Sequence, residues 1–386
     1  MNDRLNVAIV GAGIGGLTAA LALTARGINV TLFEEAASPR EAGAGISISP
    51  NAVALLKRLG LRDAIEKINT RSQGLSLRTS KGHPVPTAPA SVAPQTYQIH
   101  RVELLDMLLS AIKAEVNLGH RCVGVTETEI GARLIFANGR DYIADVVIGA
   151  DGIHSVVQHA IGLTTHPTSE GIMAYRGLVP TQRLRRGAEL RGLNMWMGSG
   201  RSFICFPVSQ GRLMNIVAFV PSSLDMEESW RAPGDVKSLA REYEGWDAPV
   251  HDLISALDQT FRWGIYDRQP LPYWSSGRVT LLGDAAHPMV PHFGQGAGQA
   301  IEDGFALAVL LERASRDEIP SRLKAYQRLR LDRTSKIQAA SRQAGRFYRS
   351  AGENLSEHAE RMREWMSVAA WIFLPYDVEE AAAASL

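Results

Sequence analysis

The feature that most constrains this chain is a glycine-rich turn between a short apolar strand and a helix near the N-terminus. Residues 5–10 (LNVAIV) predict the strand, residues 11–16 (GAGIGG) the turn, and residues 15–26 an amphipathic helix. A second strand is predicted at residues 28–33 and ends at the acid Glu34. A Gly-x-Gly-x-x-Gly run in this setting is typical of dinucleotide-binding proteins. The sequence therefore predicts a nucleotide-binding βαβ unit.

Each residue of this unit has an expected role in holding the nucleotide. Gly11 permits the tight turn, Gly13 lets the backbone approach a pyrophosphate, and Gly16 lets helix and strand pack closely. Gly15 lies in the same run at the start of the helix, where free N–H groups favour a phosphate. Glu34 is placed to accept hydrogen bonds from a ribose 2′-hydroxyl. These five residues are candidate cofactor-binding residues.

Composition excludes several other classes of protein. Lys and Arg number 41 against 40 Asp and Glu, without long runs of one sign, so no nucleic-acid or polybasic membrane surface is expected. The two cysteines, Cys122 and Cys205, form no metal-ligand cluster, and no metal site is expected. No apolar run approaches the roughly 20 residues of a membrane span, and no signal peptide is expected. A cytoplasmic protein is predicted.

The rest of the chain predicts an α/β fold in which a second sheet is inserted into a discontinuous Rossmann-like domain. Buried strands of the parallel type recur at residues 144–150 and 278–283, whereas residues 171–263 are rich in strands, Gly and Pro. Helical patterns dominate after the last of these strands. The predicted ranges are 1–74, 100–170 and 264–334 for the nucleotide-binding domain, 75–99 and 171–263 for the inserted substrate domain, and 335–386 for a C-terminal helical region.

A second motif, residues 283–298 (GDAAHPMVPHFGQGAG), follows the last buried strand. It places the carboxylate of Asp284 at the carboxyl edge of the sheet, where open α/β sheets bind ligands. The glycines at residues 294–298 stand at a helix start, whose free N–H groups would stabilise negative charge on a bound ligand. The alternative is an ordinary strand–turn–helix connection with glycine for flexibility.

Three motifs together resemble the single-component FAD-dependent aromatic hydroxylases, which have a para-hydroxybenzoate-hydroxylase-like fold. They are the N-terminal fingerprint with Glu34, residues 149–155 (GADGIHS) and residues 283–288 (GDAAHP). The order and separation of the three motifs match that family. Finer detail resembles the branch of salicylate hydroxylase and 6-hydroxynicotinate 3-monooxygenase, at residues 43–46, 100–101, 174–179 and 291–296.

The resemblance implies a monooxygenase with bound FAD, NADH or NADPH as reductant, and O₂ as co-substrate. A flavin C4a-hydroperoxide would hydroxylate a small aromatic or N-heteroaromatic substrate, and the protein would orient the reactants and exclude water. Asp284 would hold the ribityl hydroxyls, Arg101 the FAD phosphate and ribityl region, and Asp151 would serve FAD and the nicotinamide donor. The further cofactor-binding residues implied by the resemblance are Gly45, Gly296 and Ala297.

A phenolic substrate reacts faster when deprotonated, so a base is expected near the ring. The 6-hydroxynicotinate enzymes have a histidine where this chain has Ser47, which leaves both the base and a pyridine substrate in doubt. His292 is the best remaining candidate, with Pro291 beside the flavin ring, although His292 could instead be a structural histidine.

The strands of the inserted sheet supply candidate substrate contacts. Arg176 could bind a substrate carboxylate or form an ion pair between domains, and Tyr175 precedes it on the same strand. Phe203, Phe206 and Met214 could line an apolar pocket, although each is also compatible with plain core packing. The pattern fits a neutral aromatic substrate at least as well as an acid.

Other functions remain open from the sequence. They are a flavin-dependent reductase or dehydrogenase of the same fold, a peroxyflavin epoxidase or Baeyer–Villiger oxygenase, and a non-catalytic or sensory flavoprotein. A monomer or a homodimer is expected. An aromatic group near the C-terminus could cover the substrate domain or pair two subunits; its members are Trp365, Trp371, Phe373 and Tyr376.

Overall fold

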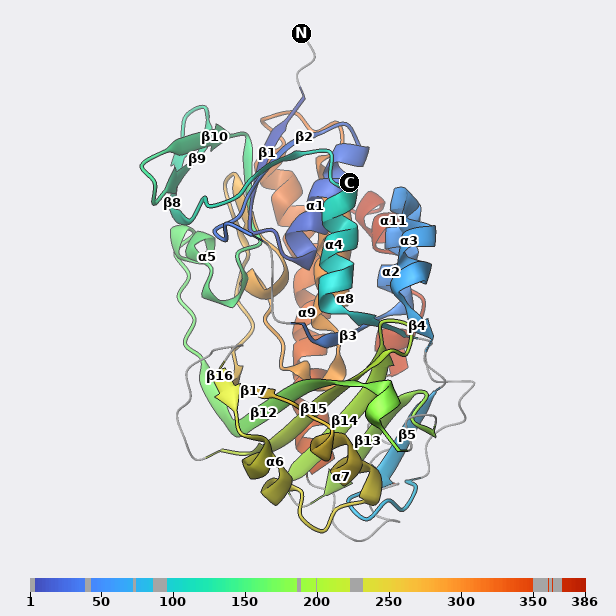
Figure 1. Ribbon diagram of the computed structural model, residues 1–386. Coiled ribbons are helices and arrows are strands. Elements are labelled where there is room, and N and C mark those ends of the chain that lie inside the picture. The colour runs from blue at the N-terminus through green and yellow to red at the C-terminus, as the bar shows by residue number, and fades with distance from the viewer. Residues whose placement is uncertain are drawn as a thin grey trace.

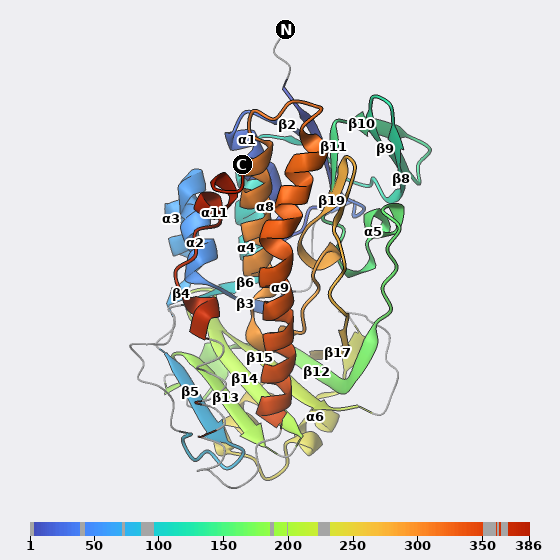
Figure 2. The same cartoon turned by 180° about the vertical axis from the view of Figure 1, so that it is seen from behind.

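The computed structural model shows two large sheets joined by long helices (Figures 1 and 2). It describes residues 4–38, 43–71, 74–85, 96–185, 189–198, 200–222, 232–349, 360, 363 and 370–386.

The first sheet has six strands in the order β18-β19-β11-β1-β2-β7. All pairs are parallel except β18 with β19. The central strands are almost completely buried, as expected for a parallel sheet covered on both faces. The strands are β1 (Asn6–Val10), β2 (Asn29–Phe33), β7 (Glu115–Asn117), β11 (Val146–Gly149), β18 (Ser275–Ser276) and β19 (Val279–Leu281).

The second sheet has seven strands in the order β16-β17-β12-β15-β14-β13-β5, antiparallel except for β13 with β5. Helices α6 (Val236–Glu242) and α7 (Ala248–Ser255) lie on its outer face, and α9 (Ile319–Arg349) runs from the first sheet to the second (Figure 2). The strands are β5 (Leu75–Thr79), β12 (Thr168–Pro180), β13 (Leu193–Gly198), β14 (Arg201–Val208), β15 (Leu213–Pro221), β16 (Ala232–Gly234) and β17 (Thr260–Asp267).

Two smaller sheets complete the strands. One has the order β3-β6-β4, with β3 (Gly45–Ile48), β4 (Thr70–Arg71) and β6 (Tyr97–His100). The other is the antiparallel meander of β8 (Cys122–Thr128), β9 (Gly131–Phe136) and β10 (Asp141–Ala144). Its β9–β10 connection contains Gly139 at a φ of 80°, which agrees with the turn signal of the Asn-Gly pair.

The helices of the first domain are α1 (Ile14–Ala25), α2 (Pro50–Leu56), η1 (Lys57–Leu61), α3 (Arg62–Ile68), α4 (Arg101–Ala111), α5 (Val156–Ala160), α8 (Gly296–Leu311) and α11 (Val378–Ala383). Short helical turns are η2 (Gly152–His154), η3 (Thr181–Arg183), η5 (Gly283–Ala285), η6 (Pro291–Phe293) and η7 (Ala370–Phe373). In the described part of the chain, no helix is both long enough and apolar enough to cross a membrane.

Glycines let α1 and α8 approach almost backbone to backbone. A Cβ on Gly304 of α8 would lie 2.8 Å from the backbone nitrogen of Ala19, and one on Gly15 of α1 would lie 3.1 Å from the Cβ of Ala300 of α8. This close crossing joins the helix that follows the glycine-rich turn to the helix that follows the second motif. Gly15 is therefore a helix-packing residue in the structure.

The predicted α/β architecture, with a parallel sheet, a separate second sheet and C-terminal helices, is confirmed. The domain ranges remain a prediction, and β17 continues to Asp267, beyond the expected boundary at residue 263.

Candidate functional site

The glycine-rich turn has the shape that close approach of a ligand requires. The N–H of Gly11 donates to the carbonyl of Phe33 at 2.7 Å, and the φ of Gly11 is 105°. A Cβ on Gly16 would lie only 2.0 Å from the carbonyl oxygen of Gly11. A Cβ on Gly13, by contrast, would meet no atom within 4 Å, so the backbone there faces open space. The turn is thus tight on its inner side and open where a phosphate would lie.

Glu34 lies at the end of β2, beside this turn. Its Oε2 accepts the N–H of Ala12 at 2.8 Å, and its Oε1 accepts the N–H of Ala36 at 2.9 Å. The carboxylate therefore fixes the turn, and each of its oxygens retains a lone pair for a further donor. Contact with a ribose hydroxyl stays a prediction.

Asp284 lies in the turn η5, directly after β19. Asp284 retains solvent-accessible surface, although many protein atoms lie around its carboxylate. Desolvation raises the pKa of Asp284, and the charges of His287, Arg101 and Arg268 act in the opposite direction. A Cβ on Gly296, at the start of α8, would lie 4.0 Å from its Oδ1. The first turn of α8, which includes Ala297, therefore lies beside this carboxylate.

Arg176 lies on β12 and belongs to the inner face of the seven-stranded sheet. Its guanidinium stacks 3.8 Å from the ring centroid of Trp263. Burial and the nearby charge of Arg101 lower the pKa of Arg176 to about 9. Because Arg101 acts on both Arg176 and Asp284, the three charged groups share one neighbourhood. A guanidinium in this position can form charge-assisted hydrogen bonds with an anionic ligand.

Phe206 lies on the same face and meets the first domain at β3. A Cβ on Gly45 would lie 2.6 Å from the Phe206 ring and 2.7 Å from Asn215. The N–H of Gly45 donates to Oδ1 of Asn215 at 2.7 Å, while Nδ2 of Asn215 is buried without a hydrogen-bond partner. Asn215 was not predicted as a site residue, although an amide inside the apolar run of β15 was a usable signal.

His292 is 5% exposed in the turn η6. Its ring lies 4.5 Å from that of Phe219, and a Cβ on Gly345 of α9 would lie 2.2 Å from it. Nη1 of Arg349 lies 3.2 Å from Nε2 of His292, and since arginine only donates, Nε2 accepts and Nδ1 carries the proton. Burial and the charge of Arg349 lower the pKa of His292 to about 3. This neutral imidazole is a poor base at neutral pH, but its buried Nδ1 has no partner within the protein.

Ser47 lies near Gly294, the residue that ends the turn containing Pro291. A Cβ on Gly294, which follows the turn containing Pro291, would lie 3.6 Å from the Ser47 Cβ. The hydroxyl of Ser47 donates to Oε1 of Gln98 at 2.7 Å, across the β3–β6 pair. Ser47 therefore links two strands, and its proton is already bonded to another side chain.

Asp151 follows β11 and caps the helix α5. Its carboxylate accepts the hydroxyl of Ser155 at 2.6 Å and the N–H groups of Val156 and Val157 at 2.8 and 3.2 Å. Next to it lies a polar cavity of about 180 Å³, whose lining includes His154, Ser155, His159 and Arg268. The carboxylate of Asp151 thus holds Ser155, which lines the cavity, in place.

Three predicted substrate residues lie on the opposite face of the sheet. Tyr175, Phe203 and Met214 are at most 3% exposed and pack in the core beneath α6 and α7. Successive residues of a strand point to opposite faces of the sheet. Tyr175, which precedes Arg176, and Phe203, three residues before Phe206, therefore face away from β3. The prediction that these three residues line the pocket is therefore corrected.

Trp371 and Tyr376 of the C-terminal aromatic group pack on Arg333 of α9, at 5.5 and 3.9 Å from their ring centroids. Trp365 lies outside the described residues. Among the residues that the structure describes, no group of histidine, cysteine or acidic side chains could hold a metal ion.

Comparison with known proteins identifies the class. Residues 4–341 match the family model described as an FAD binding domain, so the chain belongs to this family of FAD-binding proteins. It is 37% identical to the 3-amino-4-hydroxybenzoate 2-monooxygenase of Streptomyces platensis, over 96% of each chain. It is 32% identical to a salicylate hydroxylase of Pseudomonas putida, over 89% of this chain and 86% of that one.

Solved structures agree. A salicylate hydroxylase substrate complex superposes with a TM-score of 0.88 at 31% identity, covering 100% of this chain and 99% of the other. The complex of CtdE with FAD and a substrate has the same TM-score at 27% identity, covering 99% and 97%. The chain is an FAD-dependent monooxygenase of aromatic substrates, and the predicted family and branch are confirmed.

Proposed function

We propose that this enzyme hydroxylates a small aromatic acid, of the hydroxybenzoate or aminobenzoate class, using NADH or NADPH and O₂. The observation that carries this proposal is the guanidinium of Arg176, which stacks on Trp263 on the same face of the sheet as Phe206, where it would bind a carboxylate. The substrates named for the two relatives compared above are also aromatic acids. This favours an acid over the neutral aromatic that the sequence pattern alone allowed.

The residues present fit FAD. The open backbone at Gly13 would receive the pyrophosphate, Glu34 the adenosine ribose, and Asp284 the ribityl hydroxyls, with Arg101 nearby. Bound FAD would accept electrons from the nicotinamide donor and activate O₂. The first turn of α8 offers N–H groups without a side-chain cap to negative charge on the ring.

The chain's own residues would orient the substrate and exclude water. Apolar side chains line the inner face of the sheet, and Val290, just before η6, packs against them together with Phe347 and Tyr348 of α9. Arg176 would hold the carboxylate. His292 would donate a hydrogen bond from Nδ1 to a ring substituent, which replaces its expected role as a general base.

Replacing His292 with phenylalanine is expected to keep the ring contact with Phe219 and to leave FAD bound. Loss of the Nδ1–H donor should misplace the substrate, so that a larger share of consumed NAD(P)H appears as H₂O₂. The measurement is the ratio of hydroxylated product to NAD(P)H consumed. Wild-type coupling and turnover in H292F would remove His292 from the proposal.

His292 also predicts a pH effect on stability. Its pKa is about 3 in the folded protein against 6.5 ordinarily, so the unfolded chain binds more protons between these values. His292 therefore lowers stability as the pH falls from about 6.5 toward 3, and H292F should lose less stability over this window.

The polar cavity beside Asp151 supports a site for the nicotinamide donor, because His154, His159 and Arg268 offer donors to its phosphates. His154→Ala is expected to raise the KM for the donor several-fold without loss of FAD. His166→Ala, a change in an exposed histidine that does not line the cavity, is the matched control. Equal KM values in H154A and wild type would exclude this use of the cavity.

The function itself is tested by stopped-flow reduction of the holoenzyme with NADH and NADPH, with and without hydroxybenzoates, aminobenzoates and hydroxypyridines. The expected result is that one aromatic acid accelerates reduction many-fold and yields a hydroxylated product. Fast reduction without any aromatic would favour a reductase. We also propose that the enzyme is cytoplasmic and is a monomer or a homodimer. Size-exclusion chromatography of the holoenzyme measures its oligomeric state.

A further inference from the structure

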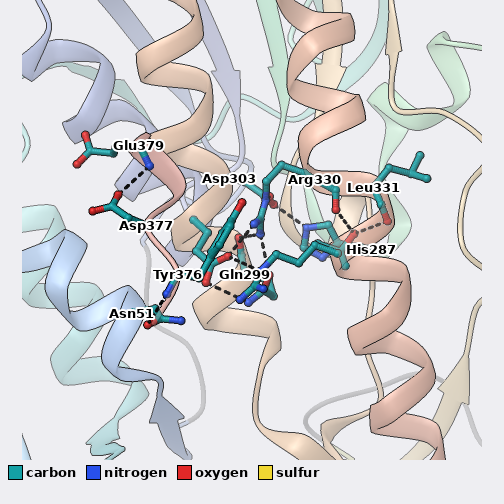
Figure 3. Close-up of polar contacts among 12 residues, drawn as sticks. Asn51, His287, Gln299, Asp303, Arg330, Leu331, Tyr376, Asp377 and Glu379 are labelled. Carbon is teal, nitrogen blue, oxygen red and sulfur yellow. Dashed lines mark hydrogen bonds and ion pairs between the residues drawn. The ribbon is translucent and has the colours of Figure 1, made fainter. Parts of the chain in front are cut away.

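A completely buried group of charged side chains joins α8 to α9 (Figure 3). Arg330 of α9 donates from Nη1 to Glu302 at 2.6 Å and from Nε to Asp303 at 2.8 Å. All three side chains are at most 1% exposed. Nη2 of the same arginine donates to Oε1 of Gln299 at 2.7 Å. Five polar side chains define this buried charge cluster: His287, Gln299, Glu302, Asp303 and Arg330.

Asp303 connects the cluster to the turn. Its Oδ2 accepts the N–H of Gly283 at 3.0 Å and faces Nε2 of His287 at 2.6 Å. Gly283 immediately precedes Asp284, and His287 follows it by three residues. One carboxylate therefore holds the backbone before Asp284 and the side chain after it. Gly283 has a φ of 59°, so the chain there is in a conformation suited to glycine.

The charge of Asp303 is what makes this attachment firm. Burial alone would raise its pKa, but His287 and Arg330 lower the pKa of Asp303 to about 2, so it is ionised at all ordinary pH values. An ionised carboxylate only accepts hydrogen bonds, so His287 must present its proton on Nε2. Charge-assisted hydrogen bonds in a buried setting are the strong ones.

We propose that Asp303 is a positioning residue for FAD: it holds residues 283–287 so that the carboxylate of Asp284 meets the ribityl chain, and Arg330 and His287 fix Asp303 in turn. This inference rests on the proposed contact of Asp284 with the cofactor. Asp303 does not touch FAD itself in this arrangement and acts through Asp284.

The test is a double-mutant cycle on the affinity for FAD, read from the flavin fluorescence released when holoenzyme is diluted. The variants are Asp303→Asn, Asp284→Asn and the double variant. D303N is expected to weaken FAD binding at least tenfold. The double variant is expected to bind FAD about as weakly as D284N alone, because Asp303 acts through Asp284. If the losses of FAD affinity in D303N and D284N multiply in the double variant, the proposal is overturned.

Asp145 supplies a matched control at the other edge of the same sheet. Its carboxylate also accepts a backbone N–H, that of Asn6 at 2.8 Å, and pairs with Arg316 at 2.7 Å. Asp145→Asn therefore removes the same kind of contact far from the proposed flavin site. D145N is expected to keep wild-type FAD affinity, and a loss equal to that of D303N would show a general structural effect and overturn the proposal.

His287 keeps the proposal testable if D303N does not fold. His287→Leu removes one donor from Asp303, whereas His287→Gln retains an N–H donor. We expect weaker FAD binding in H287L and recovery in H287Q; equal affinities in both variants overturn the proposal. If D284N binds FAD with wild-type affinity while D303N binds it weakly, both the proposed role of Asp303 and the proposed contact of Asp284 with FAD are overturned. If D284N binds FAD weakly while D303N keeps wild-type affinity, only the proposed role of Asp303 is overturned.

Discussion

Replacing Asp284 with alanine is expected to give a protein that purifies largely without flavin. The carboxylate stands at the carboxyl end of β19, beside the first turn of α8, where it would accept hydrogen bonds from two ribityl hydroxyls. A hydrogen bond to a charged group contributes about 1.5–3 kcal/mol, so losing two weakens binding by roughly 100-fold or more. The measurement is the ratio of flavin to protein absorbance after purification.

Asp284→Asn provides the comparison for this change, because asparagine keeps the size of the side chain and one acceptor oxygen. Its flavin content should lie between those of wild type and D284A. Full yellow holoenzyme from D284A, stable to dilution, would refute the ribityl contact.

Replacing Arg176 with methionine is expected to lower kcat/KM for the aromatic acid by roughly 10- to 150-fold, the value of one charge-assisted hydrogen bond. Methionine keeps much of the apolar contact with Trp263 and removes the charge. An analogue of the substrate without its carboxylate should lose far less activity. Equal losses for acid and analogue would show that Arg176 does not bind the carboxylate.

Arg262 supplies the matched control for this change. It pairs with Tyr175 in register and so faces the other side of the sheet. R262M is expected to retain the wild-type kcat/KM for the acid.

Local motifs could be predicted from the sequence because their geometry is local. The predicted first strand, helix and second strand correspond to β1, α1 and β2, and the second motif leads into α8 as expected. The packing role of Gly16 could be predicted from the motif. A Cβ there would lie 2.0 Å from the carbonyl oxygen of Gly11, which is too close for a carbon atom. Such constraints act within a few residues and leave a trace in the sequence.

The side of the second sheet that faces the cofactor could not be predicted in the same way. Alternation shows that a strand has two faces, but both faces of β14 are apolar and buried. Only the packing of α6 and α7 decides that Phe203 lies beneath them while Phe206 meets β3.

Arg330 was missed for a related reason. It lies on a long helix rich in charged residues, where an arginine in the sequence resembles a solvent-exposed side chain. Its burial depends on two acids of α8 that lie 27 and 28 residues away in the sequence.

The crossing of α1 and α8 has a consequence for how substrate enters. Gly304 packs directly on the backbone of Ala19, so the two helices have little room to shift against each other at this crossing, and this end of the molecule is expected to move as one body. Among the described residues, β3 meets β15 through the hydrogen bond from Gly45 to Asn215, and the two strands belong to different sheets. We therefore expect the motion that admits an aromatic substrate to occur at this interface. The seven-stranded sheet would tilt while the bound flavin stays in place.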